Sequence, residues 1–258
     1  MKTFTFGLIA DPQYGEIPSR GSRFYSNSLE KIRRCTEIFQ NESVSFAVCL
    51  GDMVEGSPNA AKECEDATAA LLYGGFPCHF VIGNHDVHAV SRSFLTRLWN
   101  YPDDRGYYAF SFGGVLFLVL DTNYNEEGLP SGIDSEGGPC EWTKTYVSEE
   151  QLEWIEKTLM NAQEDRAIVF SHSLLDNFSG VYDPHNLRNA CSVRKIFAKT
   201  GKVTAVFQGH MHSGYQSVSD GICYTTLPGL VETPDRIYAM LVTVSPESLT
   251  LKPRILTL

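Results

Sequence analysis

The fold is first indicated by Phe4-Thr5-Phe6-Gly7-Leu8-Ile9-Ala10, a short apolar run that is followed at once by Asp11, Pro12 and Gln13. A run of this length that is rich in aromatic and branched residues and stops at an acidic residue is typical of a buried strand. In α/β sheets, ligands bind outside the carboxyl ends of the strands. Asp11 and Gln13 are therefore candidate functional residues.

The same arrangement recurs along the chain. Further short apolar runs, rich in Val, Ile and Phe, occupy residues 44–50, 79–82, 115–120, 167–170 and 203–207. Four of them are followed closely by side chains that bind metals or move protons: Asp52, Asn84, His85, Asp86, His172, His210 and His212. We expect these side chains to meet at the carboxyl ends of several strands.

Helical patterns lie between several of these runs. An apolar stripe within residues 29–39 follows Asn27 or Ser28, either of which can act as N-cap. Residues 148–151, Ser-Glu-Glu-Gln, match a capping box ahead of a second amphipathic helix. Alternating strands and helices predict a mixed sheet, or two stacked sheets, with helices outside.

Two segments in the middle of the chain depart from this alternation of strands and helices. Two strand-like runs within residues 107–120 flank Gly113-Gly114, which predicts a β-hairpin because both glycines can take positive φ. Residues 126–139 are rich in Gly, Pro and Ser and predict a surface loop. We find no repeat or linker, so residues 1–258 are expected to form a single domain.

Composition restricts the partners. The chain has 258 residues with 21 Lys or Arg and 31 Asp or Glu, so 21 − 31 gives a net charge of −10. This balance argues against nucleic acid and against anionic membrane surfaces, which both need clustered basic residues. The N-terminus lacks the pattern of a signal peptide. Seven scattered cysteines without a C-x-x-C pair indicate reduced thiols and a cytoplasmic location.

The donor types after the strands indicate a particular metal chemistry. Carboxylate, amide oxygen and imidazole together suit a pair of first-row divalent ions. A cysteine-rich structural zinc site is excluded because none of the segments that follow the strands contains cysteine. Asp52 is the natural bridging ligand, because one carboxylate can hold two ions about 3.5–4 Å apart.

The five motifs have a recognisable order. D-x-Q at 11–13, G-D-x-x-E at 51–55, G-N-H-D at 83–86, S-H at 171–172 and G-H-x-H at 209–212 resemble those of the calcineurin-like metallophosphoesterase superfamily. Gln in place of the usual His in the first motif is also found in the branch of Mn²⁺-dependent ADP-ribose/CDP-alcohol diphosphatases. The chain resembles this branch over nearly its whole length. The resemblance implies a four-layer αββα sandwich of two mixed β-sheets flanked by helices.

The resemblance also implies a ligand set. It places Asp11, Gln13, Asp52 and His212 around one metal and Asp52, Asn84, His172 and His210 around the other. An amide oxygen is a weaker ligand than imidazole, so Gln13 favours Mn²⁺ or Mg²⁺ over Zn²⁺ at the first site. We expect two divalent ions, with Mn²⁺ favoured and Fe²⁺, Mg²⁺ and Zn²⁺ as alternatives.

Catalytic and substrate-binding roles are assigned to residues beside the ligands. His85 is the candidate proton donor to the leaving group, with Asp86 expected to orient its imidazole. Tyr14, Arg23 and Tyr25 follow the first ligands and either contact substrate or pack on the following helix. His88 could face the cleft. Of the other histidines, His79 begins a strand and is expected in the core or at an edge, and His185 lies in a turn-like stretch and is expected to be solvated.

The leading functional hypothesis is a metal-dependent phosphohydrolase that cleaves phosphodiester or diphosphate bonds in nucleotide-type small molecules. A cyclic-nucleotide phosphodiesterase or a general phosphomonoesterase is the alternative, because similar sites serve many substrates. A non-enzymatic scaffold that retains the fold should have lost ligands or His85, and none is missing. The substrate, the resident metals and the oligomeric state stay open at this point.

Overall fold

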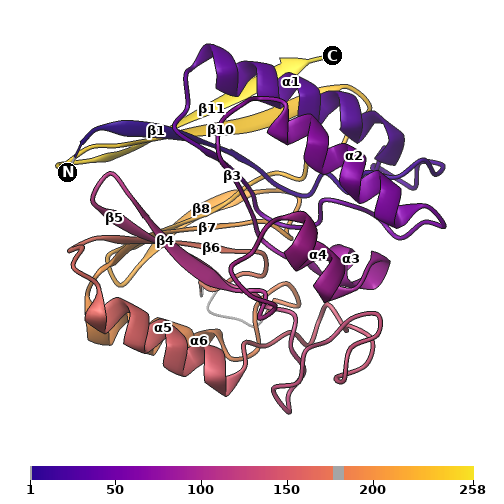
Figure 1. Ribbon diagram of the computed structural model, residues 1–258. Coiled ribbons are helices and arrows are strands. Elements are labelled where there is room, and N and C mark those ends of the chain that lie inside the picture. Colours follow the sequence, from indigo (N-terminus) through magenta and orange to yellow (C-terminus); the bar gives the residue numbers. More distant parts are fainter. Residues whose placement is uncertain (1, 177–182) are drawn as a thin grey trace.

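The computed structural model describes residues 2–176 and 183–258, which are arranged in four layers (Figure 1). Helices α1 (Ser28–Asn41) and α2 (Ala60–Leu72) cover the outer face of one sheet. Helices α5 (Glu149–Asn161) and α6 (Ala190–Thr200) cover the outer face of the other. The two sheets pack against each other between these helices, so the expected αββα architecture is confirmed.

The first sheet has five strands in the order β11-β10-β1-β2-β3. Three neighbouring strands are parallel: β1 (Phe4–Ile9) at the centre, then β2 (Ala47–Cys49), then β3 (Cys78–Phe80) at the edge. Strands β10 (Arg236–Val244) and β11 (Leu249–Thr257) add antiparallel pairs on the other side. The parallel strands therefore end at one edge of the sheet.

The second sheet has six strands in the order β4-β5-β6-β7-β9-β8. Its inner strands are parallel: β5 (Val115–Val119), β6 (Ala167–Ser171), β7 (Val203–Gln208) and β9 (Ile222–Thr226). Strands β4 (Tyr108–Phe112) and β8 (Tyr215–Ser219) close the two sides with antiparallel pairs. The hairpin predicted around Gly113-Gly114 is the β4–β5 pair, with φ of 60° and 85° at the two glycines.

Short helices complete the fold near the ends of the first sheet. A 3₁₀ turn, Tyr25–Asn27, leads into α1, and α3 (Asn84–Ala89) and α4 (Arg92–Leu98) follow β3. As predicted, the part of the chain from 126 to 139 forms neither helix nor strand. No helix in the described ranges is both long and apolar enough to span a membrane.

Aromatic side chains fill the space between the sheets. The ring of Phe6 is stacked on Phe46 at 4.9 Å and meets Phe117, Phe170 and Phe207 edge-on at 5.8–5.9 Å. Such ring contacts stabilise the fold beyond the free energy gained by burying apolar area. Because strand side chains alternate, Phe4, Phe6 and Leu8 all face this layer. The aromatic layer therefore fixes how the two sheets lie on each other.

Individual residues also determine how the helices pack on the outer faces of the sheets. Gly7 lies on the α1 side of β1, where a Cβ would come within 2.5 Å of the Phe39 ring, so glycine lets the helix approach. At the start of α5, the Ser148 hydroxyl accepts the Gln151 amide as predicted, at 3.1 Å. Gln151 does not complete the capping box, because its side chain binds both backbone groups of Asp121, just after β5.

We expect Phe6→Ala to destabilise the protein by about 3–5 kcal/mol, because the substitution leaves a cavity among four aromatic rings. Urea unfolding followed by circular dichroism measures this free energy. Tyr73→Ala is the control, since Tyr73 is 83 % exposed and should change stability by less than about 0.5 kcal/mol. Equal stability of the two variants would contradict the role of the aromatic layer.

Candidate metal centre

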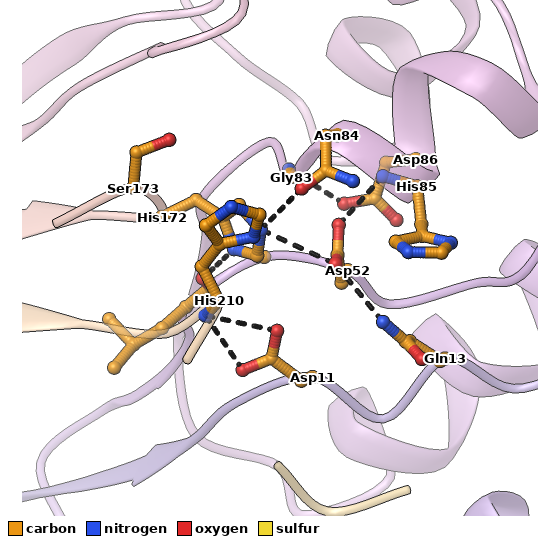
Figure 2. A network of polar contacts seen from close by, with 12 residues as sticks. Asp11, Gln13, Asp52, Gly83, Asn84, His85, Asp86, His172, Ser173 and His210 are labelled. Carbon is orange, nitrogen blue, oxygen red and sulfur yellow. Dashed lines mark hydrogen bonds and ion pairs between the residues drawn. The ribbon is translucent and has the colours of Figure 1, made fainter. Parts of the chain in front are cut away.

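Six of the seven expected ligand residues meet where the parallel strands of both sheets end (Figure 2). Asp11 and Gln13 follow β1, Asp52 follows β2, and Asn84 begins α3 shortly after β3. His172 follows β6, and His210 follows β7. All six are at most 8 % exposed. The structure therefore brings together residues that are up to 199 positions apart in the sequence.

The backbone at this edge is strained. Asp11, Gln13, Asp52 and His210 have φ of 51°, 44°, 52° and 68°, in the left-handed region that non-glycine residues avoid. Each such residue costs of order 1 kcal/mol or more, and strain of this kind persists where surrounding structure enforces it. Four of the nine non-glycine residues with positive φ among the described residues are expected ligands at this edge, so backbone strain is concentrated there.

Asp52 lies at the centre of the group. Its Oδ1 accepts the backbone N–H of His85 at 2.8 Å, and its Oδ2 lies 3.2 Å from Gln13 Nε2 and 3.3 Å from His172 Nε2. Burial raises the pKa of Asp52, but His172 and His85 outweigh this effect and hold the pKa well below its usual range. Asp52 is therefore an ionised carboxylate that faces both expected ligand sets.

One set consists of Asp52, Asn84, His172 and His210. Asn84 Oδ1 lies 3.0 Å from His172 Nε2, and donor atoms of Asp52, His172 and His210 all lie within 4.8 Å of one another. The Nδ1–H of His172 donates to the Leu50 carbonyl at 2.9 Å, which directs Nε2 toward the other ligands. Ligands about 2.1 Å from an octahedral cation lie about 3 Å from each other, so the spacing fits a cation.

The other set consists of Asp11, Gln13, Asp52 and His212. His212 Nε2 lies 3.5 Å from Asp11 Oδ1 and 3.4 Å from the Gln13 amide. The Nδ1 of His212 bonds to Glu232 Oε1 at 2.7 Å, which again directs Nε2 toward the ligands. A carboxylate that holds a ligating imidazole in this way is common in metal sites.

Two buried atoms of the ligand residues lack hydrogen-bond partners among the described residues, namely His210 Nε2 and Gln13 Oε1. Burial and nearby His172 hold the pKa of His210 well below its usual range, so its imidazole is neutral and can bind a cation. A half-turn of the Gln13 amide brings its oxygen between Asp52 and His212. Two divalent cations therefore fit the donors that the chain presents.

His85 lies beside this centre with its Nδ1 bonded to Glu55 Oε1 at 2.9 Å. Burial lowers the pKa of His85, but Asp52 and Glu55 outweigh it and raise the pKa above its usual value. Because Nδ1 is engaged, Nε2 is the ring nitrogen left to interact with a ligand. Glu55 is the last residue of the G-D-x-x-E motif, and its role as the partner of His85 was not foreseen.

The expectation that Asp86 orients His85 is wrong. Asp86 is fully buried, and its two oxygens accept the backbone N–H groups of Gly83 and Val54 at 2.9 and 3.1 Å. It occupies the third position of α3, where a carboxylate reaches back to the start of the helix. Asp86 therefore supports the loop that carries Asn84, and Glu55 takes the role assigned to it.

Five of the seven expected ligands, Gln13, Asp52, Asn84, His210 and His212, border a cavity of about 250 Å³, which Arg23, His85 and His88 also line. Arg23 and His85 border a second cavity of about 480 Å³ as well, and Tyr25 lies in the wall of that second cavity. Tyr14 is buried, packs in the core and bonds to Glu16, so of its two expected roles the structure supports packing and not contact with substrate. A larger groove of about 590 Å³ between α1 and α2 contains none of the ligands.

Other residues near the site were missed or misjudged from the sequence. His185 is half-buried and lines the 250 Å³ cavity together with Trp142, so the expectation that it is solvated is wrong. Lys31 is buried in α1 and donates to the carbonyls of Leu230, Glu232 and Thr233, which holds the loop of Glu232 beside His212. A lysine beside the apolar stripe of α1 was the available sign of this contact.

Glycines make room for the ligands at two places. A Cβ at Gly83 would lie 2.1 Å from Asp52 Oδ1, and a Cβ at Gly51 would lie 2.5 Å from His172 Nδ1. Gly51 also has a φ of 97°, which suits glycine alone. The close approach of the strand ends therefore requires glycine at position 83, beside Asp52, and at position 51, beside His172.

We expect Gly83→Ala to weaken Mn²⁺ binding about 10–100-fold, because the added methyl group displaces the Asp52 carboxylate. Isothermal titration of metal-stripped protein measures the affinity and the stoichiometry. Gly56→Ala is the matched control, since a Cβ there meets nothing within 4 Å. If Gly83→Ala and Gly56→Ala both bound Mn²⁺ as tightly as the unmodified protein, metal binding would not depend on the close contact between residues 83 and 52.

The chain is similar to known proteins over most of its length. The chain is 28 % identical to a manganese-dependent ADP-ribose/CDP-alcohol diphosphatase from Oryza sativa subsp. japonica, over 90 % of this chain and 84 % of the relative. It is 27 % identical to the human protein of the same name, over 98 % and 90 %. A human serine/threonine-protein phosphatase is 30 % identical over 81 % of this chain and 69 % of its own.

Solved structures share the fold. A dimetal phosphatase from Danio rerio superimposes with a TM-score of 0.80, at 22 % identity and 98 % coverage of both chains. A purple acid phosphatase from yellow lupin gives a TM-score of 0.66 at 15 % identity, covering 98 % of this chain and 51 % of its own. The family model for Calcineurin-like phosphoesterase matches residues 4–214. The chain therefore belongs to the calcineurin-like phosphoesterase family.

Proposed function

We propose that this phosphoesterase hydrolyses the diphosphate bond of nucleoside diphosphates that carry a small sugar or alcohol, as in ADP-ribose and CDP-alcohols. The observation that carries the proposal is the pair of ligand sets that share Asp52, with His85 beside them. We further propose Mn²⁺ as the resident metal, since oxygen donors in these sets suit it and the diphosphatase relatives are named as manganese-dependent.

Charge favours a phosphate-rich substrate at this site. Two divalent ions carry +4 and the carboxylates of Asp11 and Asp52 carry −2, so the loaded centre attracts diphosphate although the whole chain is acidic. Such ions supply Lewis-acid stabilisation of phosphate and activate water as the nucleophile. Arg23 borders the same cavity and is placed to bind a phosphate oxygen.

The chain supplies the remaining proton chemistry. The leaving oxygen needs a proton, and His85 Nε2 is the atom we assign to donate it. Glu55 holds the other ring nitrogen and so fixes the direction in which the imidazole points. Arg23 and His88 complete the substrate-binding residues we propose at this cavity, and Tyr25 borders the adjoining one.

Two cavities that meet at Arg23 and His85 favour a diphosphate over the alternatives. A diphosphodiester carries a substituent on each side of its phosphates and can extend into both cavities. The 30 % identity to a serine/threonine-protein phosphatase makes phosphomonoester hydrolysis the second candidate. A cytoplasmic location fits the seven free cysteines and belongs to the same proposal.

A substrate screen in the presence of Mn²⁺ tests the function. We expect ADP-ribose and CDP-choline to be hydrolysed with a kcat/KM at least tenfold above those of 3′,5′-cyclic AMP, p-nitrophenyl phosphate and a phosphoserine peptide. Chromatography of the products measures each rate. Preferred hydrolysis of the phosphopeptide would replace the proposal with the protein-phosphatase activity, and absence of diphosphate turnover would reject it.

Substitutions at His85 and Glu55 test the proton donor. We expect His85→Ala to retain the Mn²⁺ stoichiometry of the unmodified protein and to lose about 10²–10⁴-fold in kcat, because a lost general acid has this effect. Glu55→Gln should lower kcat less, since the amide can still bond to the ring. Steady-state kinetics and metal analysis check both. An unchanged kcat in His85→Ala would remove this residue from the mechanism.

A further inference from the structure

The 250 Å³ cavity is lined by an indole, Trp142, for which the metal chemistry gives no role. Trp142 lies in the long connection between β5 and α5 and lines the cavity beside His185 and His210. It is 40 % exposed, and among the large apolar side chains exposed in residues 2–176 and 183–258 it is the one that borders this cavity. A large indole at the edge of a polar site is a candidate contact for substrate.

The segment that carries Trp142 is anchored on both sides. Cys140 is buried, with its Sγ 3.8 Å from Asn123 Oδ1, and Asn123 in turn donates to the Ile82 carbonyl. Thr145 is also buried, and its carbonyl accepts the backbone N–H of Arg188 at 2.9 Å. The indole is therefore held in place before any ligand arrives, which reduces the entropy that binding would cost.

The neighbouring imidazole is held as well. The side chain of Asp183 accepts both the backbone N–H and the Nδ1–H of His185, at 2.9 and 2.7 Å. The ring of Trp142 lies 5.2 Å from that of His185 and 5.6 Å from that of His210. Three rings thus form one side of the cavity, and the exposed part of the indole is available to a planar group.

We propose that Trp142, with His185 beside it, is the platform on which the nucleobase of the substrate stacks. The inference rests on the proposed function, since it assumes a nucleotide substrate. Stacking of a base on an aromatic side chain contributes about 1–3 kcal/mol and tolerates different bases, because every base has a π-face. A stacking platform therefore suits a site that accepts both adenine and cytosine nucleotides.

The placement also orients the reaction. In Figure 2, His210 and His85 lie on opposite sides of Asp52, and Trp142 is packed on His210. The base and the leaving group beside His85 are then at opposite ends of the bound substrate. Water attacks the phosphorus next to the nucleoside and gives up a proton to solvent. The bond from this phosphorus to the bridging oxygen breaks, and that oxygen leaves with the other phosphate and takes a proton from His85, which solvent then restores.

Inhibition by two product-like molecules tests the platform. AMP and ribose 5-phosphate differ by the adenine base, and hydrolysis of bis-p-nitrophenyl phosphate with Mn²⁺ reports how strongly each binds. We expect Trp142→Ala to raise the inhibition constant of AMP about 5–150-fold and that of ribose 5-phosphate less than twofold. Trp142→Phe keeps an aromatic face and should lie close to the unmodified protein.

The controls separate this inference from the proposed function. Metal analysis of both variants must give the stoichiometry of the unmodified protein, since Trp142 touches His210. An unchanged AMP constant, or equal weakening of both inhibitors, would overturn the platform. Failure of the unmodified protein to hydrolyse ADP-ribose would reject the proposed function, whereas the AMP comparison would still decide the platform.

Hydrolysis of ADP-ribose in H₂¹⁸O tests the orientation with the unmodified protein. We expect mass spectrometry to find the label in AMP, because water attacks the phosphorus on the nucleoside side. Label in ribose 5-phosphate would overturn the placement of the base beside Trp142.

Discussion

The buried carboxylate of Asp52 joins the loops of both sheets. It is 1 % exposed, its backbone is left-handed, and side chains or backbone from β1, β3 and β6 ends contact its two oxygens. A charge in such a place is costly unless it is paired. Removing it would leave Gln13, His172 and the start of α3 without their common partner, so both ligand sets depend on it.

The core makes this convergence possible. The aromatic layer around Phe6 fixes the distance and angle between the sheets, and the parallel strands of each sheet then end on the same side of the molecule. Glycines at 51 and 83 let the strand ends approach, and the strained backbone of the ligand residues is held by that packing. The free energy gained by packing the interior therefore offsets the cost of holding donor atoms close together, where they would otherwise repel one another.

Local patterns predicted the strands, the β4–β5 hairpin and the polar side chains that converge at the strand ends, because each of these is encoded in a few adjacent residues. The partner of His85 could not be found in this way. Asp86 is its neighbour in sequence, but the helical turn of α3 directs that carboxylate to backbone N–H groups, and Glu55 arrives from another loop. Trp142 and His185 were likewise missed, since long connections without periodic patterns bring them to the cavity.

Crystals soaked with Mn²⁺ and measured at a wavelength where manganese scatters anomalously test the central claim most directly. We expect two anomalous peaks that both contact the Asp52 carboxylate, one also contacting Gln13 and His212 and the other Asn84, His172 and His210. A single peak that avoids Asp52, or peaks confined to surface carboxylates, would contradict a metal pair bridged by this residue.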